Sequence, residues 1–271
     1  MTPFEPLRAF WSAWGALNPI CDPTPWGLVV GDPRFPAVWE SNHAAVFSKL
    51  RTITPDDIRR RLLPILRRAG ALYEHVEFWD PPARCRALRA MKAEADHSGI
   101  DSVMVFEGDP SHLPESRGPA VRVRHLRNPG AGFWRVYTTS RSEFGGSMDD
   151  ATIRALVRRD REVLVSAGLQ IFAGYVDGEL AGFASLISLA GVGYVDNVVT
   201  LPRFRRRGIA SATIARAVRE SLANGDGLVH LLTAERGGPV RLYEGLGFRS
   251  RGTVASVTRR LRQDGRPSSG R

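Results

Sequence analysis

Residues 37–106 alternate between short apolar runs and stretches with an apolar residue at every third or fourth position. Short apolar runs favour strands, and apolar residues spaced three or four positions apart favour helices. The pattern therefore predicts strands at 37–47, 73–79 and 101–106. The first helix is expected to start after Thr54, because threonine caps helix N-termini and the two acids that follow complement the helix dipole. A second helix is expected over 83–97. This alternation is typical of a compact α/β unit.

The pattern breaks at residues 108–119, where Gly, Pro, Ser and charged residues cluster without periodicity. Such a composition is typical of a linker. We therefore expect one domain over residues 1–115 and a second over 116–262. Residues 263–271 end in Gly, Ser and Arg without apolar periodicity, which predicts a disordered tail.

The second half follows a longer series of elements. In order, the pattern predicts a strand at 121–126, helices at 133–144 and from Met148, strands at 171–176, 180–188 and 193–200, a helix from near Gly208, a strand at 228–233 and a helix after Pro239. Asp177-Gly178 joins the second and third of these strands, and this dipeptide is a strong signal for a β-hairpin.

The segment from Leu201 to Val218 (LPRFRRRGIASATIARAV) places a basic turn between a predicted strand and a predicted helix. A helix N-terminus exposes backbone N–H groups and a partial positive charge, which suits an anionic phosphate. Gly208 has no side chain to keep a ligand from the backbone, and Arg205, Arg206 and Arg207 can pair with phosphate oxygens. The pattern therefore indicates a cofactor that carries a pyrophosphate. A solvated basic turn without a ligand is the alternative.

The charge of the chain raises a second question about its partners. The sequence has 38 Lys plus Arg against 28 Asp plus Glu, for a formal net charge of +10, which is typical of proteins that bind nucleic acid. All of these cations except Lys49 and Lys92 are arginine. A compositional bias toward arginine explains the positive charge as well as a nucleic-acid partner does. The basic segment from Arg249 onward lacks interleaved aromatic residues that could stack on bases, so no specific nucleic-acid partner is expected.

The location of the protein is predicted from its cysteines and apolar runs. Cys21 and Cys85 form neither a disulfide framework nor a metal-ligand spacing, which favours a reducing compartment and no metal site. The longest uncharged run, 180–195, is shorter than the ~20 residues of a spanning helix, and the first residues do not resemble a signal peptide. We expect a cytoplasmic protein with no membrane partner.

The basic turn resembles a known family signature. Pro202, Arg205, Gly208 and Ala210 match the R/Q-x-x-G-x-G/A pattern of the GNAT acetyltransferases, in which this loop holds the pyrophosphate of acyl-CoA. The strand and helix around it, the next strand and a final LYEGLGF segment follow in the family's order. The resemblance covers roughly 121–260. The whole chain also resembles a two-domain bacterial arrangement, in which a degenerate GNAT-like half without this signature precedes an intact one.

The resemblance implies a fold, a co-substrate and a binding site. The fold is the acyl-CoA N-acyltransferase fold of the α/β (α+β) class, a mixed sheet flanked by helices, here in tandem. The co-substrate is acetyl-CoA, and no metal is required. The residues that the resemblance places against it are Val198, Val199, Thr200, Arg205, Arg206, Arg207, Gly208, Ile209, Ala210 and Ser211.

The resemblance also implies catalytic roles for two residues. An amine attacks the thioester directly within a ternary complex, and Asp196 is the candidate base that removes its proton, directly or through water. A backbone N–H of residues 198–200 would stabilise the oxyanion, and Tyr243 would protonate the departing CoA thiolate. Two alternatives remain open: Asp196 serves as a local cap or ion-pair partner, and Tyr243 is a core aromatic residue. The sequence departs from the family at Arg236, where an Asn often contacts the cofactor.

These observations together predict an N-acetyltransferase that modifies a primary amine of a small molecule or a peptide. The alternative is a module that binds or senses acyl-CoA without turnover. The acceptor groove is expected to involve residues 133–150 and 235–239. The sequence leaves the acceptor, the role of the first half and the oligomeric state open.

Overall fold

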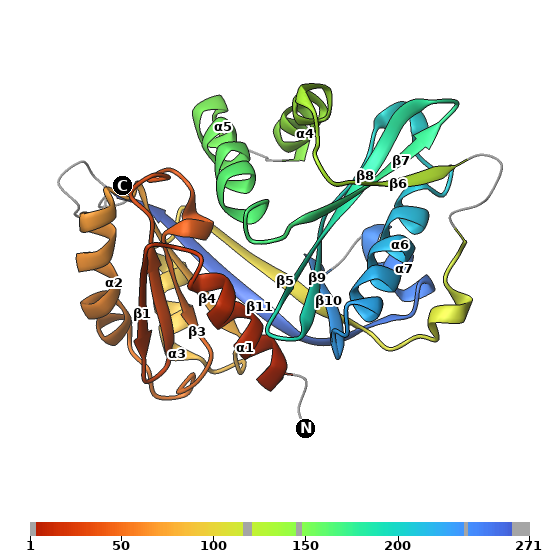
Figure 1. Ribbon diagram of the computed structural model, residues 1–271. Coiled ribbons are helices and arrows are strands. Elements are labelled where there is room, and N and C mark those ends of the chain that lie inside the picture. Colours follow the sequence, from red (N-terminus) through yellow and green to blue (C-terminus); the bar gives the residue numbers. More distant parts are fainter. Residues whose placement is uncertain (1–3, 116–120, 145–147, 236–237, 262–271) are drawn as a thin grey trace. The chain divides into compact units, whose positions relative to one another are not determined.

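The computed structural model describes residues 4–115, 121–144, 148–235 and 238–261, and it divides the chain into two compact units (Figure 1). The first unit comprises the residues up to Val103 and those from Arg251 onward, and the second comprises Met104–Ser250. This division differs from the expected boundary at residue 115. The last strand returns to the first unit because its residues Val254–Arg260 pair with Tyr73–Trp79, a long-range contact that chain order does not indicate.

The first unit contains more elements than its apolar pattern predicted. They are α1 (Phe4–Gly15), β1 (Ile20–Thr24), β2 (Gly27–Gly31), a 3-10 turn (Trp39–Ser41), β3 (His43–Val46), α2 (Pro55–Ala69), β4 (Tyr73–Trp79), α3 (Arg86–Ala93) and β5 (His97–Phe106). The expected helix at 83–97 is shorter in the structure because β5 already begins at His97. Residues 97–100 are exposed, so this part of the strand carries no apolar pattern.

The strands of the first unit run in the order β1-β2-β3-β4-β11-β5, in which β11 (Phe248–Arg260) is the returning last strand. β1, β2 and β3 are antiparallel neighbours, whereas β3 and β4 are parallel and α2 connects them. The predicted start of α2 is confirmed: Thr54 Oγ1 accepts a hydrogen bond from the Asp57 N–H at 3.2 Å, and the Asp57 carboxylate accepts one from the Thr54 N–H at 3.1 Å. This reciprocal cap satisfies donors at the N-terminus of α2.

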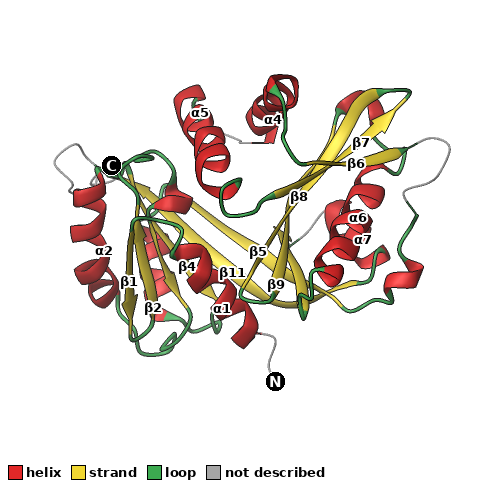
Figure 2. Cartoon of the chain, in the orientation of Figure 1, coloured by secondary structure: helices red, strands yellow, loops and turns green. Residues whose placement is uncertain are grey.

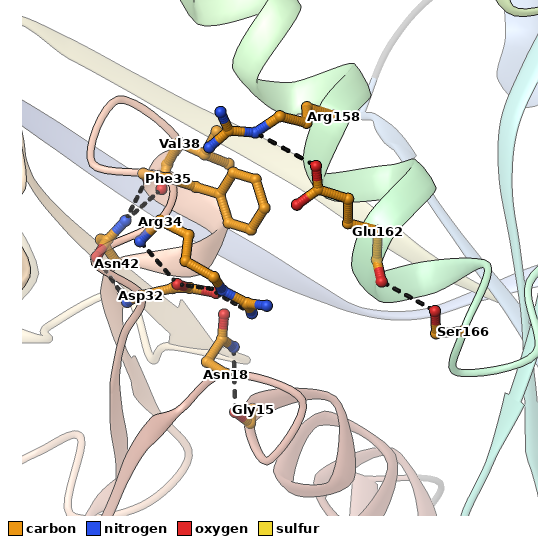
Figure 3. A network of polar contacts seen from close by, with 10 residues as sticks. All are labelled: Gly15, Asn18, Asp32, Arg34, Phe35, Val38, Asn42, Arg158, Glu162 and Ser166. Carbon is orange, nitrogen blue, oxygen red and sulfur yellow. Dashed lines mark hydrogen bonds and ion pairs between the residues drawn. The ribbon is translucent and has the colours of Figure 1, made fainter.

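A buried polar cluster fixes the connection between β2 and β3 (Figure 3). Asp32, fully buried, forms an ion pair with Arg34 at 2.6 Å, and its backbone N–H donates to Asn42 Oδ1 at 3.0 Å. Asn42 Nδ2 in turn donates to the carbonyls of Phe35 and Val38 at 2.8 and 2.9 Å. The loop is therefore held by its own side chains.

The second unit holds the remaining elements. They are β6 (Arg122–Leu126), α4 (Ala131–Phe144), α5 (Asp150–Arg159) with a π-helical turn (Asp160–Leu164), β7 (Gln170–Val176), β8 (Glu179–Leu189), β9 (Val192–Thr200), α6 (Ile209–Ala223), β10 (Leu228–Ala234) and α7 (Gly238–Gly245) (Figure 2). Strand β11 begins in this unit at Phe248 and belongs to the first unit from Arg251 onward. The expected hairpin is present, and Asp177 and Gly178 both have the positive φ of a type I′ turn, +50° and +84°.

Helices cover both faces of the sheet in the second unit, whose strands run in the order β10-β9-β8-β7-β6 (Figure 1). On one face, Phe133, Tyr137 and Ile153 of α4 and α5 pack against Ile171 and Phe183. On the other face, α6 residues such as Ile214 and Val218 pack against Phe172, Ala184 and Leu186. This alternation along β7 and β8 buries both faces of the sheet.

The two units repeat one order of elements. In the first, three antiparallel strands (β1-β2-β3) are followed by α2, β4, α3 and β5; in the second, β7-β8-β9 are followed by α6, β10, α7 and β11. In each unit the strand after the helix is parallel to the third strand. Among the helices described, none is both long enough and apolar enough to cross a membrane.

Candidate active site

The second unit contains a pocket where two parallel strands separate. β9 and β10 pair only through their first residues, Val192–Tyr194 with Leu228–His230. Beyond these pairs the two strands continue to Thr200 and Ala234. A pocket of about 210 Å³ lies there, lined by Tyr137, Ser140, Arg141, Phe183, Val195, Asp196, Asn197, Val198, Val199, Leu232 and Tyr243. The structure thus brings together Asp196, Val198, Val199 and Tyr243 from the predicted site.

A β-bulge shapes the wall that β9 gives to this pocket. Ser185 pairs with Asp196 and Phe183 pairs with Val199, so Asn197 and Val198 share a single partner position on β8. Asn197 has φ +51°, in the left-handed region that asparagine tolerates better than most residues. A bulge leaves the strand ladder locally incomplete at these two residues.

Asp196 lies in the pocket with hydrogen-bond donors on both carboxylate oxygens. Asn197 Nδ2 donates to Oδ2 at 2.9 Å, and the Tyr194 hydroxyl lies 3.5 Å from Oδ1. Burial raises the pKa of Asp196, and the nearby Arg141 guanidinium partly opposes this rise. The carboxylate is therefore a stronger proton acceptor than an exposed aspartate.

Tyr243 reaches the same pocket from α7. Its side chain is 8% exposed and packs edge-on against Phe248 at 6.2 Å between ring centroids. Burial, together with the charge of Asp196, raises the pKa of Tyr243 to about 12. The residue belongs to the core and also lines the pocket, and its hydroxyl keeps its proton at neutral pH.

Helix α4 adds a polar wall that lies within the segment 133–150 expected at the acceptor groove, although the sequence did not single out its individual residues. The Tyr137 hydroxyl donates to Asp160 Oδ2 at 2.7 Å, and Arg141 Nη2 lies 3.2 Å from the same oxygen. Asp160 is fully buried, and burial beside this carboxylate raises the pKa of Tyr137 well above its usual value. Tyr137, Ser140 and Arg141 occupy one face of α4, three and four residues apart, and that spacing is the sequence signal that could have found them.

The basic turn lies where the sequence placed it, directly before α6. Gly208 is the N-cap residue with φ +78°, and a Cβ built on it would meet no atom within 4 Å. Arg205, Arg206 and Arg207 are exposed, whereas the Ile209 side chain is buried in the core. Ile209 can therefore face a ligand only through its backbone. Ala210 and Ser211 complete the first turn.

Some expected positions lie outside the described residues. Arg236 is one of them, as are part of the 235–239 segment and the tail 263–271.

Thr200 ends β9 opposite Gly182 and is not among the residues that line the pocket. Asn197 carries no sequence signal, because a bulge depends on its partner strand. In the described part of the chain, no group of three or more His, Cys, Asp or Glu side chains is arranged to hold a metal ion.

Known proteins share this architecture. Residues 133–248 match the model of the Acetyltransferase (GNAT) family. No curated protein gave a significant sequence match. Among solved structures, a functionally unknown conserved protein from Staphylococcus epidermidis ATCC 12228 is 15% identical with a TM-score of 0.66, over 87% of this chain and 91% of that one.

Two further structures resemble the chain at similar identity. A GCN5-related N-acetyltransferase from Kribbella flavida is 16% identical with a TM-score of 0.61, over 95% of this chain and 96% of that one. A tandem GNAT protein from the clavulanic acid biosynthesis pathway is 15% identical with a TM-score of 0.53, over 77% of this chain and 69% of that one. Likeness at this identity establishes the fold. The family assignment rests on the matched segment: residues 133–248 form a domain of the Acetyltransferase (GNAT) family.

Proposed function

We propose that this protein transfers an acetyl group from acetyl-CoA to a primary amine by direct attack within a ternary complex. The observation that carries the proposal is the pocket itself. It sets a carboxylate, Asp196, and a protonated phenol, Tyr243, at the point where β9 and β10 separate. Family membership supports acyl-CoA-dependent N-acetyl transfer as the type of reaction.

Acetyl-CoA would bind through the turn that precedes α6. Gly208 has no side chain to cap the helix, so the first backbone N–H groups of α6 remain for the pyrophosphate oxygens. The open space at Gly208 lets those oxygens approach the backbone, and the exposed side chains of Arg205, Arg206 and Arg207 can pair with them. This donor set suits an anion.

The pocket residues would then handle two protons. Asp196 accepts the proton that the amine loses, directly or through a water molecule, as its nitrogen bonds to the thioester carbon. Backbone N–H groups of Val198 to Thr200 donate to the carbonyl oxygen while it is negative. When the carbon–sulfur bond breaks, Tyr243 gives its proton to the CoA thiolate. The amide and free CoA are the products.

The first unit is proposed to be a degenerate GNAT-like half that does not bind acyl-CoA. Its repeated order of elements supports the GNAT-like part of this proposal. The helix equivalent to α6 is α2, and Thr54 and Asp57 already cap its N-terminus. Asp56 and Asp57 place two negative charges in that first turn, which repel a phosphate.

The test is an acetyl-transfer assay with a panel of primary amines that includes amino acids, polyamines and peptides with free N-termini. CoA release is measured with a thiol reagent and the acetylated amine by mass spectrometry. We expect the two products in equal amounts. The Asp196→Asn/Tyr243→Phe double variant is the control for uncatalysed transfer. Tight acetyl-CoA binding with no product from any amine would instead favour a sensing module.

A further inference from the structure

The side chains of Asp196 and Asn197 meet although the two residues are neighbours on one strand. Successive side chains of a regular strand point to opposite faces of the sheet. The left-handed φ of Asn197, +51°, and the bulge against β8 remove this alternation. As a result, Asn197 Nδ2 donates to Asp196 Oδ2 at 2.9 Å.

A second contact fixes the Asn197 amide from the neighbouring strand. Its Nδ2 also lies 3.3 Å from Ser185 Oγ, and that hydroxyl donates to the Asp196 carbonyl at 2.9 Å. A primary amide has two N–H groups, so both bonds can form at once. Ser185 is fully buried, and the amide therefore has little freedom to turn away from the carboxylate.

We propose that Asn197 is a positioning residue for the transfer reaction: its left-handed conformation holds its amide on Asp196, which keeps the carboxylate aimed into the pocket and stabilises its charged form. The inference rests on the proposed function, in which Asp196 accepts the proton of the amine. A donated hydrogen bond to a carboxylate favours the ionised state, so loss of the amide should make Asp196 bind its proton more tightly.

Other charged and titratable groups also act on Asp196. Arg141 and Tyr137 approach from α4, Arg159 and Asp160 from the end of α5, and Tyr243 from α7. On its own strand, Tyr194 lies 3.5 Å from Oδ1 and stacks on His230 at 4.9 Å between ring centroids. Burial lowers the pKa of His230 to about 3, so this imidazole stays neutral and adds no charge. The backbone N–H of Asn197 also donates to the carboxylate and lowers its pKa. All of these groups, including that backbone N–H, are retained when the Asn197 side chain is replaced.

The variants separate the amide from the backbone conformation. Asn197→Gly keeps the left-handed conformation without strain and removes the amide, whereas Asn197→Asp keeps the shape and replaces the donor with a second carboxylate. Asp177→Gly is the matched control, since Asp177 also has a left-handed φ, +50°, in the exposed hairpin away from the pocket. Thermal unfolding identifies any variant that fails to fold.

The experiment measures the protonation of Asp196 directly and in turnover. Protein labelled with 13C at the aspartate carboxyl is titrated by NMR, and the Asp196 signal is assigned by its loss in Asp196→Asn. We expect Asn197→Gly to raise the proton affinity of Asp196 by about tenfold, one pKa unit, and Asn197→Asp to raise it further. In turnover, the acid limb of kcat/KM moves to higher pH by the same amount, while the KM for acetyl-CoA stays within about twofold.

The outcomes separate this inference from the proposed function. An unchanged titration of Asp196 in Asn197→Gly overturns the inference, and so does a loss of activity that is equal at every pH. If the titration shifts but the wild-type protein acetylates no amine, the amide acts on Asp196 as inferred and the proposed function is what fails. A shift of similar size in Asp177→Gly would also overturn the inference.

Discussion

Gly208 provides a sharp test of the proposed phosphate-binding turn, because the same helix carries a matched control at its other end. Gly208 precedes α6 with φ +78°, and Gly225 follows it with φ +86°. A Cβ on either residue would meet no atom within 4 Å. Alanine at either position therefore introduces the same left-handed strain, about 1–2 kcal/mol, and no steric clash within the protein.

The two alanine variants should differ only in ligand binding. Both are expected to lower the melting temperature by a similar few degrees. Gly208→Ala also places a methyl group where the pyrophosphate would approach the first N–H groups of α6. Loss of one hydrogen bond to a charged group costs about 1.5–3 kcal/mol, so the Kd for acetyl-CoA should rise about 10- to 150-fold. Gly225→Ala should bind acetyl-CoA like the wild type.

Isothermal titration calorimetry with acetyl-CoA, at a temperature well below either melting point, measures this difference. Wild-type affinity in Gly208→Ala would refute the assignment of the turn as the phosphate site. Equal weakening in both variants would mean that strain in α6, rather than contact at its N-terminus, controls binding.

Three further predictions follow from the site. Tyr243→Phe should lower kcat at least tenfold and leave the acetyl-CoA affinity, measured by calorimetry, nearly unchanged. Because the pKa of Tyr243 is raised to about 12, its deprotonation should cause no loss of activity below about pH 11. Wild-type turnover of the variant across the pH range would exclude Tyr243 as the proton donor. Asp196→Asn should raise the melting temperature more at pH 8 than at pH 4.5. Burial raises the pKa of Asp196 above its unfolded value of about 3.9, so ionisation costs stability once the pH exceeds that value, and an equal effect at both pH values would contradict the burial argument. Calorimetry should give one acetyl-CoA per chain. Thr54 and Asp57 already cap the N-terminus of α2, so that helix offers no second phosphate site, and two equivalents would contradict this.

Features that depend on neighbours in the chain could be predicted from the sequence alone. The cap at Thr54, the turn at Asp177-Gly178 and the start of α6 after Gly208 each follow from the backbone preferences of a few adjacent residues. The same holds for the basic turn, whose candidate role needs only its place between a strand and a helix. The basic turn also carried the resemblance of the second half of the chain to the GNAT family signature.

The site as a whole depends on contacts that the sequence does not express. Asp196 and Tyr243 come from β9 and α7, and only packing against the shared core brings them to one pocket. The return of β11 to pair with β4 set the unit boundary in the same way. The bulge at Asn197 needs its register with β8, and the polar wall of Tyr137 and Arg141 needs the buried Asp160. Local preferences therefore determined the basic turn before α6, whereas long-range pairing and burial decided which side chains line the pocket.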